Sequence, residues 1–154
     1  MTLMDLRLPD MSGIDSMIAI RSKFPEARLI ILTTLAGDAE IQRALEAGAR
    51  AYLLKSMSRD ELLDVIRQVL TKANLVPKSG LVTYFRSTSV GSERIRILVV
   101  DDHPLLNEGL ATVIRNRRDV VLAGEASSGH EADSFRDRRV LSCITAKNGS
   151  PRAK

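Results

Sequence analysis

Short apolar runs alternate with stretches of helical periodicity along most of the chain. The runs of strand length lie at 2–5, 28–33, 51–54, 96–100 and 120–123. Amphipathic spacing between and after them predicts helices over 13–23, 38–47, 58–70, 105–115 and 130–138. Strands that alternate with helices are typical of βα units, so the pattern predicts a parallel sheet covered by helices.

Local signals place several of the predicted helix ends. Pro25 ends the first helix, Asp38 is expected to be the N-cap of the second, and Gly48 follows that helix, where a positive φ costs glycine little. Ser58 and Glu61 have the spacing of a capping box, in which each side chain bonds the other's backbone N–H. The helix that begins there has a buried stripe of Leu62, Val65, Ile66 and Val69.

Periodicity lapses after residue 72 and resumes at residue 94. The interval contains Pro77, Gly80, Gly91 and several Ser and Thr residues, so we interpret 73–93 as a linker between two segments, 1–72 and 94–139. Residues 140–154 are predicted to be a disordered tail. A chain of 154 residues is long enough for one α/β domain and too short for two of ordinary size.

The composition of the chain indicates what kind of side chains form the core and in which compartment the protein is found. Hydrophobic residues make up 44% of the chain but aromatic residues only 3%, which indicates a core of aliphatic side chains. The apolar runs are too short to span a bilayer and no signal sequence opens the chain, so we expect a cytoplasmic protein without membrane contact. Cys143 has no second cysteine to pair with and is interpreted as incidental.

The net charge of +4 does not indicate a nucleic-acid surface. Residues 1–76 contain ten basic and ten acidic side chains, and the basic surplus lies in 77–96 and 147–154, outside the predicted elements except for the strand start at 96. A basic helix with stacking aromatic residues is missing from the sequence, so direct binding of nucleic acid is not expected.

Reactive side chains follow the predicted strands. Asp5, Thr33, Lys55 and the pair Asp101-Asp102 stand at strand ends, and ligands of open parallel sheets bind beyond that edge. Two carboxylates about 5 Å apart repel by about 3 kcal/mol at an effective dielectric constant near 20, which favours a bound cation. Oxygen ligands without His or Cys favour Mg²⁺.

Four stretches resemble the receiver domain of bacterial two-component response regulators, of the NarL/FixJ type. Residues 95–104 (IRILVVDDHP) are similar to its opening strand and acidic pair, and residues 4–13 (MDLRLPDMSG) to its phosphorylation-site segment. Residues 32–34 (LTT) and 49–55 (ARAYLLK) resemble its switch-threonine and lysine segments. The resemblance implies a flavodoxin-like (CheY-like), doubly wound, five-stranded parallel sheet.

The resemblance also implies roles for individual residues. Asp5 would accept the phosphoryl group, and Mg²⁺ would be bound by Asp5 and Asp102, by Asp101 through water, and by the Arg7 carbonyl. Lys55 would neutralise a phosphoryl oxygen.

The Thr33 hydroxyl would close on another phosphoryl oxygen and draw Tyr52 inward, so that the surface of residues 38–70 reports the modification. The partner would be a histidine kinase or a small phosphodonor. Such a module is a signalling phosphoacceptor rather than an enzyme, beyond catalysing its own phosphotransfer and dephosphorylation.

The order of the parts differs from that of the family. The Asp101-Asp102 strand comes last here, so 94–139 followed by 1–72 would restore the family order. We therefore expect a circularly permuted domain, or a homodimer in which two chains exchange these segments.

Other interpretations remain open at this point. A pseudo-receiver that only binds a partner would keep the same residues without phosphorylation, whereas a haloacid-dehalogenase-like phosphatase would need an Asp-x-Asp pair that is absent. Each motif residue alone has an ordinary explanation as a cap, a strand end or a solvated side chain. His103 is expected to have a secondary role beside the acids, and His130 to be an ordinary surface residue.

Overall fold

The structure, a computed structural model, describes residues 1–34, 37–70 and 94–135. These residues form five strands: β1 (Thr2–Asp5), β2 (Leu29–Thr33), β3 (Ala51–Leu54), β4 (Ile95–Val100) and β5 (Val120–Ala126). The helices are α1 (Gly13–Lys23), α2 (Asp38–Glu46), α3 (Arg59–Leu70), α4 (Pro104–Arg115) and α5 (Gly129–Ser134). The predicted linker 73–93, the tail 140–154 and Cys143 lie outside the described residues.

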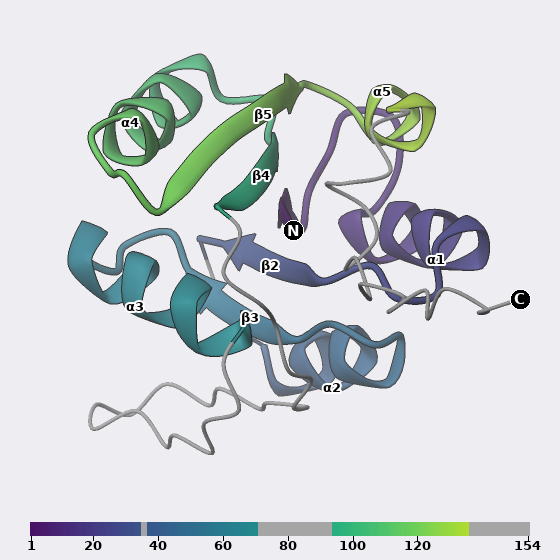
Figure 1. The fold of residues 1–154 in the computed structure, drawn as a ribbon. Coiled ribbons are helices and arrows are strands. Elements are labelled where there is room, and N and C mark those ends of the chain that lie inside the picture. Colours follow the sequence, from purple (N-terminus) through teal and green to yellow (C-terminus); the bar gives the residue numbers. More distant parts are fainter. Residues whose placement is uncertain (35–36, 71–93, 136–154) are drawn as a thin grey trace, which may run out of the picture.

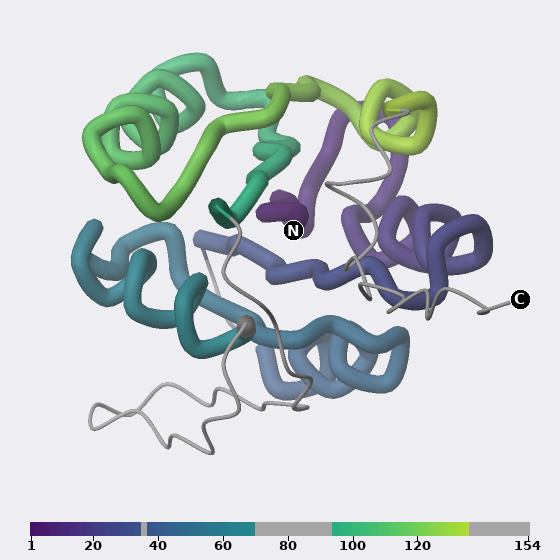
Figure 2. Tube along the Cα trace, in the orientation of Figure 1, coloured from purple at the N-terminus to yellow at the C-terminus, as the bar shows by residue number. Residues whose placement is uncertain are grey.

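The five strands make one parallel sheet in the order β3-β2-β1-β4-β5. Strand β1 therefore pairs on one side with its neighbour in sequence, β2, and on the other with β4 from the second segment. Figure 2 shows the N-terminal strand inserted between these two parts of the trace. The predicted doubly wound five-stranded sheet is confirmed.

Helices cover both faces of the sheet (Figure 1). On one face α3 and α4 pack against side chains such as Leu3, Leu53 and Val99. On the other face α1, α2 and α5 pack against side chains such as Met4, Ile31 and Val100. Successive side chains of a strand point to opposite faces, and the helices bury both faces of β1 and β2, which explains the apolar residues 3–4 and 29–32 within these strands. No helix of the described segments is long and apolar enough to cross a membrane.

The predicted capping box and the predicted positive φ are both present. Ser58 N–H donates to Glu61 Oε2 over 2.9 Å and Glu61 N–H donates to Ser58 Oγ over 3.3 Å. Gly48 has a φ of 98°, and among the described residues it is the glycine with a left-handed backbone.

Three predicted details are wrong. Asp38 is not the N-cap, because Gly37 holds the extended backbone before α2 and Asp38 lies inside the first turn. Helix α5 begins at Gly129 and ends at Ser134, since Phe135 leaves helical geometry with a ψ of 118°. Strand β5 continues to Ala126 rather than ending at residue 123, because a register shift opposite Ile97 and Leu98 lets it keep pairing with β4.

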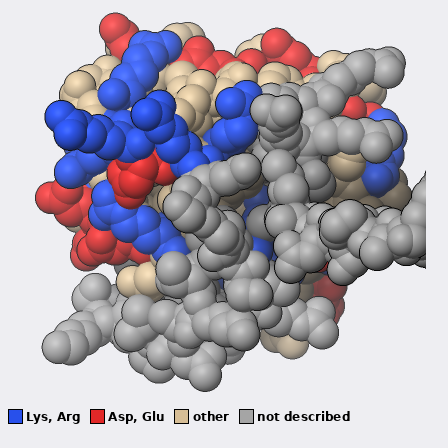
Figure 3. Space-filling view, in the orientation of Figure 1, with Lys and Arg blue, Asp and Glu red and all other residues tan. Residues whose placement is uncertain are grey.

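Exposed ion pairs join the two segments at their surface. Arg67 of α3 pairs with Asp119 over 2.8 Å, and Arg117 pairs with Asp60 over 3.1 Å. Figure 3 shows basic and acidic side chains interspersed on the side that carries α3 and α4. Pairs as exposed as these contribute between zero and about 1 kcal/mol each, so the buried sheet holds the segments together far more strongly.

Candidate functional site

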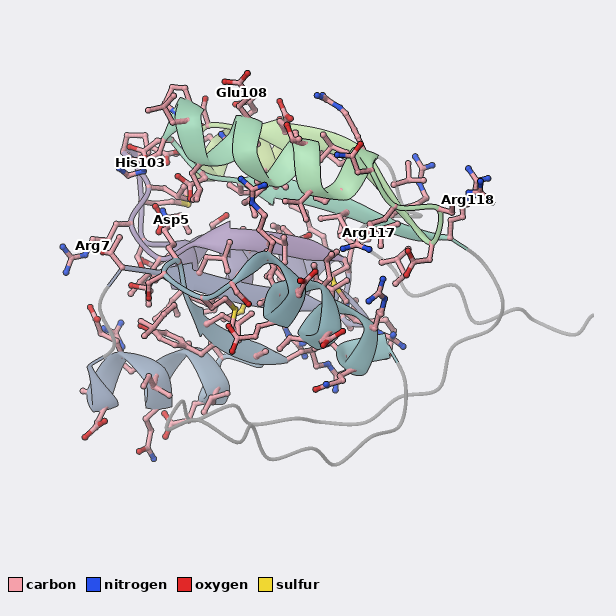
Figure 4. The ribbon with its side chains drawn as sticks, turned by 90° about the vertical axis from the view of Figure 1, so that its left-hand side faces the viewer. Asp5, Arg7, His103, Glu108, Arg117 and Arg118 are labelled. Atoms are coloured by element: carbon pink, nitrogen blue, oxygen red, sulfur yellow. The ribbon has the colours of Figure 1, made fainter. Side chains whose placement is uncertain are left out.

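The sheet brings the predicted site residues to one edge. Asp5 ends β1, Thr33 ends β2, Lys55 follows β3 and Asp101 follows β4. All these strands are parallel, so their carboxyl ends meet at the same edge although the residues come from both segments. Figure 4 shows Asp5 and His103 together at this edge, with the Arg7 side chain pointing away from them.

Lys55 joins the two segments at the centre of the site. Its Nζ lies 2.8 Å from Asp5 Oδ2 and 2.6 Å from Asp101 Oδ2. The three side chains are 9%, 5% and 0% exposed. Burial alone would lower the pKa of Lys55, but the hydrogen bonds and charges of Asp101 and Asp5 outweigh it and raise that pKa. The ammonium therefore stays charged and compensates part of the buried negative charge.

Asp102 and His103 stand at the open side of the same cluster. The His103 Nδ1 atom lies 3.0 Å from Asp101 Oδ1, 3.0 Å from Asp102 Oδ1 and 3.9 Å from Asp5 Oδ2. The His103 backbone N–H also donates to Asp101 Oδ1 over 2.9 Å. The side chains of Asp102 and His103 are 37% and 65% exposed, so solvent reaches the cluster from this side.

The four side chains have the spacing of a cation site. Asp5, Asp101, Asp102 and His103 each offer one ligand atom, and these atoms lie within 4.8 Å of one another. Three carboxylates against the single ammonium of Lys55 leave an excess negative charge of two when His103 is neutral. A divalent cation would balance this excess, and three carboxylate oxygens suit the preference of Mg²⁺ for oxygen ligands. The residues present therefore fit magnesium.

The loop that follows Asp5 is closed on itself. Arg7 and Ser12 form an antiparallel bridge, and Gly13 N–H donates to the Leu6 carbonyl over 2.8 Å. Gly13 lies so close to Asp5 that an added Cβ would be 2.0 Å from the Asp5 carbonyl oxygen. Ser12 then caps α1 by accepting the Ile14 N–H. This geometry explains why Ser12 and Gly13 stand at the start of α1.

The predicted metal ligand Arg7 is near Asp5 through its backbone. Its N–H donates to Asp5 Oδ1 over 3.3 Å, which orients the carboxylate. The role of its carbonyl as a ligand stays a prediction.

Thr33 and Tyr52 lie behind the cluster, and both are only 3% exposed. The Lys55 N–H donates to the Thr33 carbonyl over 2.7 Å, which links the two strand ends. Burial raises the pKa of the Tyr52 phenol, and the Thr33 side chain acts in the opposite direction. The Tyr52 ring is already inside, so the expected inward movement would start from a buried ring.

Two residues of this region were missed by the sequence analysis. Asp10, in the loop after β1, accepts the backbone N–H groups of Gly129 and His130 over 2.8 Å each. His130, interpreted as an ordinary surface residue, also approaches Asp10 Oδ2 through its ring Nδ1. The partners are 119 and 120 positions apart, so no local pattern in the sequence could reveal the contact.

In a comparison with known proteins, residues 1–67 match the family model of the response regulator receiver domain. The response regulator protein VraR of Staphylococcus aureus (strain Mu3 / ATCC 700698) is 36% identical over 66 residues, which are 43% of this chain and 32% of VraR. This chain thus spans about a third of the length of that relative.

Solved receiver structures match a similar share of the chain. A LuxR-family two-component response regulator from Aurantimonas sp. SI85-9A1 is 39% identical, covering 44% of this chain and 48% of its own, with a TM-score of 0.42. A CheY-like receiver domain protein from Methanospirillum hungatei JF-1 is 32% identical, covering 43% and 53%, with a TM-score of 0.41. The matched residues 1–67 include Asp5, Thr33 and Lys55 of the site.

Proposed function

We propose that the chain is a phosphoacceptor module of a two-component signal transduction system, in which Asp5 is phosphorylated with the assistance of Mg²⁺. The observation that carries the proposal is the Lys55 ammonium between Asp5 and Asp101, because it joins residues 1–67, which match the receiver model, to a buried carboxylate from residues 94–135. The proposed chemistry is phosphoryl transfer, in which the protein mainly positions and neutralises charge.

The transfer assigns one task to each residue. An Asp5 oxygen attacks phosphorus in line, the bond from phosphorus to the donor atom breaks, and an acyl phosphate forms on Asp5. Lys55 then pairs with a phosphoryl oxygen, and the Thr33 hydroxyl donates a hydrogen bond to another. When bound by Asp5, Asp101, Asp102 and the Arg7 carbonyl, Mg²⁺ supplies positive charge that stabilises the developing negative charge on the phosphoryl oxygens.

We infer that the second segment, 94–139, supplies the strand and the acidic pair with which a receiver domain of the usual order begins. Strand β4 lies between β1 and β5 in the sheet, and its carboxyl end holds Asp101 and Asp102. In this interpretation 94–139 and 1–72 form a circularly permuted receiver of the NarL/FixJ type, connected through 73–93. The module would act in the cytoplasm.

The phosphodonor would be a histidine kinase or a small molecule that approaches from the exposed side of the cluster. Leu105 is 85% exposed two residues after His103, and it lines a groove of about 280 Å³ together with Lys55 and Gly109. The surface of residues 38–70 would respond to the modification through Thr33 and Tyr52.

Binding of beryllofluoride, a phosphoryl analogue, tests the acceptor assignment. With Mg²⁺ present, the wild-type protein is expected to show a bound fluorine NMR signal and a raised melting temperature. Asp5→Asn keeps the shape of the side chain but removes its charge, and it should lose both responses. Asp15→Asn, an exposed position on α1, should keep both. An unchanged response in the Asp5 variant would mean that another residue is the acceptor, whereas a wild-type protein without any response would favour a pseudo-receiver.

A further inference from the structure

The carboxylate of Asp10 connects the loop after Asp5 to the start of α5. It accepts two backbone N–H groups, of Gly129 and His130, over 2.8 Å each, and the His130 ring Nδ1 lies 2.5 Å from its Oδ2. These hydrogen bonds from His130 and Gly129 hold the pKa of Asp10 far below 3.8, so the carboxylate is ionised at neutral pH. Charge-assisted bonds of this kind are about twice as strong as neutral ones.

On one side of this contact, the chain leads directly to the acceptor. Asp10 lies in the turn that the Arg7–Ser12 bridge closes, and the same turn holds the Asp5 carboxylate through the Arg7 N–H. Gly13, at the end of the turn, packs against the Asp5 carbonyl without space for a Cβ. A displacement of Asp10 would therefore be transmitted to Asp5 and to the Arg7 carbonyl.

On the other side, the chain leads to the acidic pair. Gly129 follows β5, whose last residue, Ala126, is paired with Val100 and accepts the Asp101 N–H over 3.0 Å. Gly129 also packs against the Met11 side chain, where an added Cβ would be 2.5 Å from Met11 Cγ. The contact is thus tightly packed as well as hydrogen-bonded. It is connected to Asp101 through the short chain segment from Gly129 back to Ala126 and through the hydrogen bond from the Asp101 N–H to the Ala126 carbonyl.

We propose that Asp10 is a positioning residue, which holds the Asp5 loop at a fixed place relative to Asp101 and Asp102 and so keeps the three carboxylates within reach of one cation. Asp10 itself does not touch the cation. Because the contact joins residues 1–67 to residues 94–135, it fixes the geometry of a site that neither segment contains alone. The proposal rests on the proposed function in that the cation is taken to be Mg²⁺.

Titration calorimetry with Mg²⁺ alone tests the proposal. Asp10→Asn and Asp10→Ala should raise the magnesium dissociation constant about ten-fold, the lower end of the range for residues that support metal ligands from outside. The matched control is Asp133→Asn, because Asp133, also on α5, pairs with Lys23 of α1 in an exposed ion pair that is not part of the Asp10 contact. That control should leave the dissociation constant unchanged. Equal affinities in the wild-type protein and both Asp10 variants would overturn the proposal.

Amide NMR spectra without metal separate this proposal from the proposed function. Asp10→Asn should shift amide signals at 5–7 and 101–103, in addition to those of Gly129 and His130, at a temperature where the variant is folded. Shifts confined to the neighbours of the substituted side chain and to 128–131 would overturn the positioning role, whether or not Mg²⁺ binds. A wild-type protein that binds no Mg²⁺ would refute the proposed function, and these spectra would then decide on the role of Asp10.

Discussion

Replacing Lys55 by methionine removes the cation that compensates the buried carboxylates. Methionine keeps most of the length of the side chain but leaves Asp5 and Asp101 buried, with ligand oxygens within 4.8 Å of each other. At that separation two negative charges repel by about 3 kcal/mol at an effective dielectric constant of 20. Removal of one partner from a buried ion pair typically costs about 3–5 kcal/mol, which agrees with this figure. We therefore expect the free energy of unfolding to fall by about 3 kcal/mol or more.

Urea unfolding followed by circular dichroism in the presence of a chelator measures this loss. Lys23→Met is the matched control, because Lys23 forms a comparable ion pair with Asp133 but with side chains 54% and 29% exposed. An exposed pair contributes at most about 1 kcal/mol, so the control should remain close to the wild-type protein. If both methionine variants lose the same small amount, the Lys55 ammonium does not compensate buried charge as described.

Mg²⁺ extends the same test. A divalent cation in the acid cluster would replace the charge that Lys55→Met removes, so the ion should stabilise this variant more than the wild-type protein. Equal stabilisation of the two proteins at the same Mg²⁺ concentration would contradict the proposed location of the cation.

Four further substitutions test the surrounding structure. Gly13→Ala should destabilise the protein by at least about 2 kcal/mol, because its Cβ would meet the Asp5 carbonyl. Gly109→Ala on α4 is the matched control: its Cβ would meet nothing within 4 Å, so it should stabilise the protein by up to about 1 kcal/mol. Urea unfolding measures both changes. Ser58→Ala should cost about 1 kcal/mol in the same assay, because it removes one half of the capping box. A loss below about 0.5 kcal/mol, the size of an ordinary surface substitution, would contradict that role. The pKa of Asp10 is lowered in the folded protein, so its stabilising contribution is present above the unfolded-state pKa of 3.8 and is lost as the pH falls below that value. Between about pH 5 and about pH 2, the Asp10→Asn variant should therefore lose less stability than the wild-type protein.

The arrangement of the sheet could be predicted because both of its faces are buried. A strand such as β2 is then apolar at each position before Thr33, whereas the helices between strands have one apolar face, so strand and helix can be distinguished by their periodicity. Helix ends were less predictable because they depend on neighbours in space. Phe135 leaves the helix and its ring lies against Gly124, where an added Cβ would be only 2.5 Å away, and this contact is invisible in the local pattern.

The site was predictable in its residues but not in its contacts. Strand ends place Asp5, Lys55 and Asp101 at one edge of a parallel sheet, which is a consequence of topology alone. The position of Lys55 between the two carboxylates depends on the side-chain conformations, and the Asp10 contact depends on how α5 packs beside α1. Long-range contacts of this kind leave no periodic signal in a single sequence.

Phosphorylation by acetyl phosphate, followed by mass spectrometry of the intact protein and of its peptides, tests the central claim most directly. With Mg²⁺, the wild-type protein is predicted to gain one phosphoryl group, located on Asp5 in the peptide that contains 1–7. Asp5→Asn and Asp102→Asn should both fail to gain it, although these residues lie in different segments of the chain. A phosphoryl group on the Asp5 variant, or undiminished phosphorylation of the Asp102 variant, would contradict an acceptor site built jointly from the two segments.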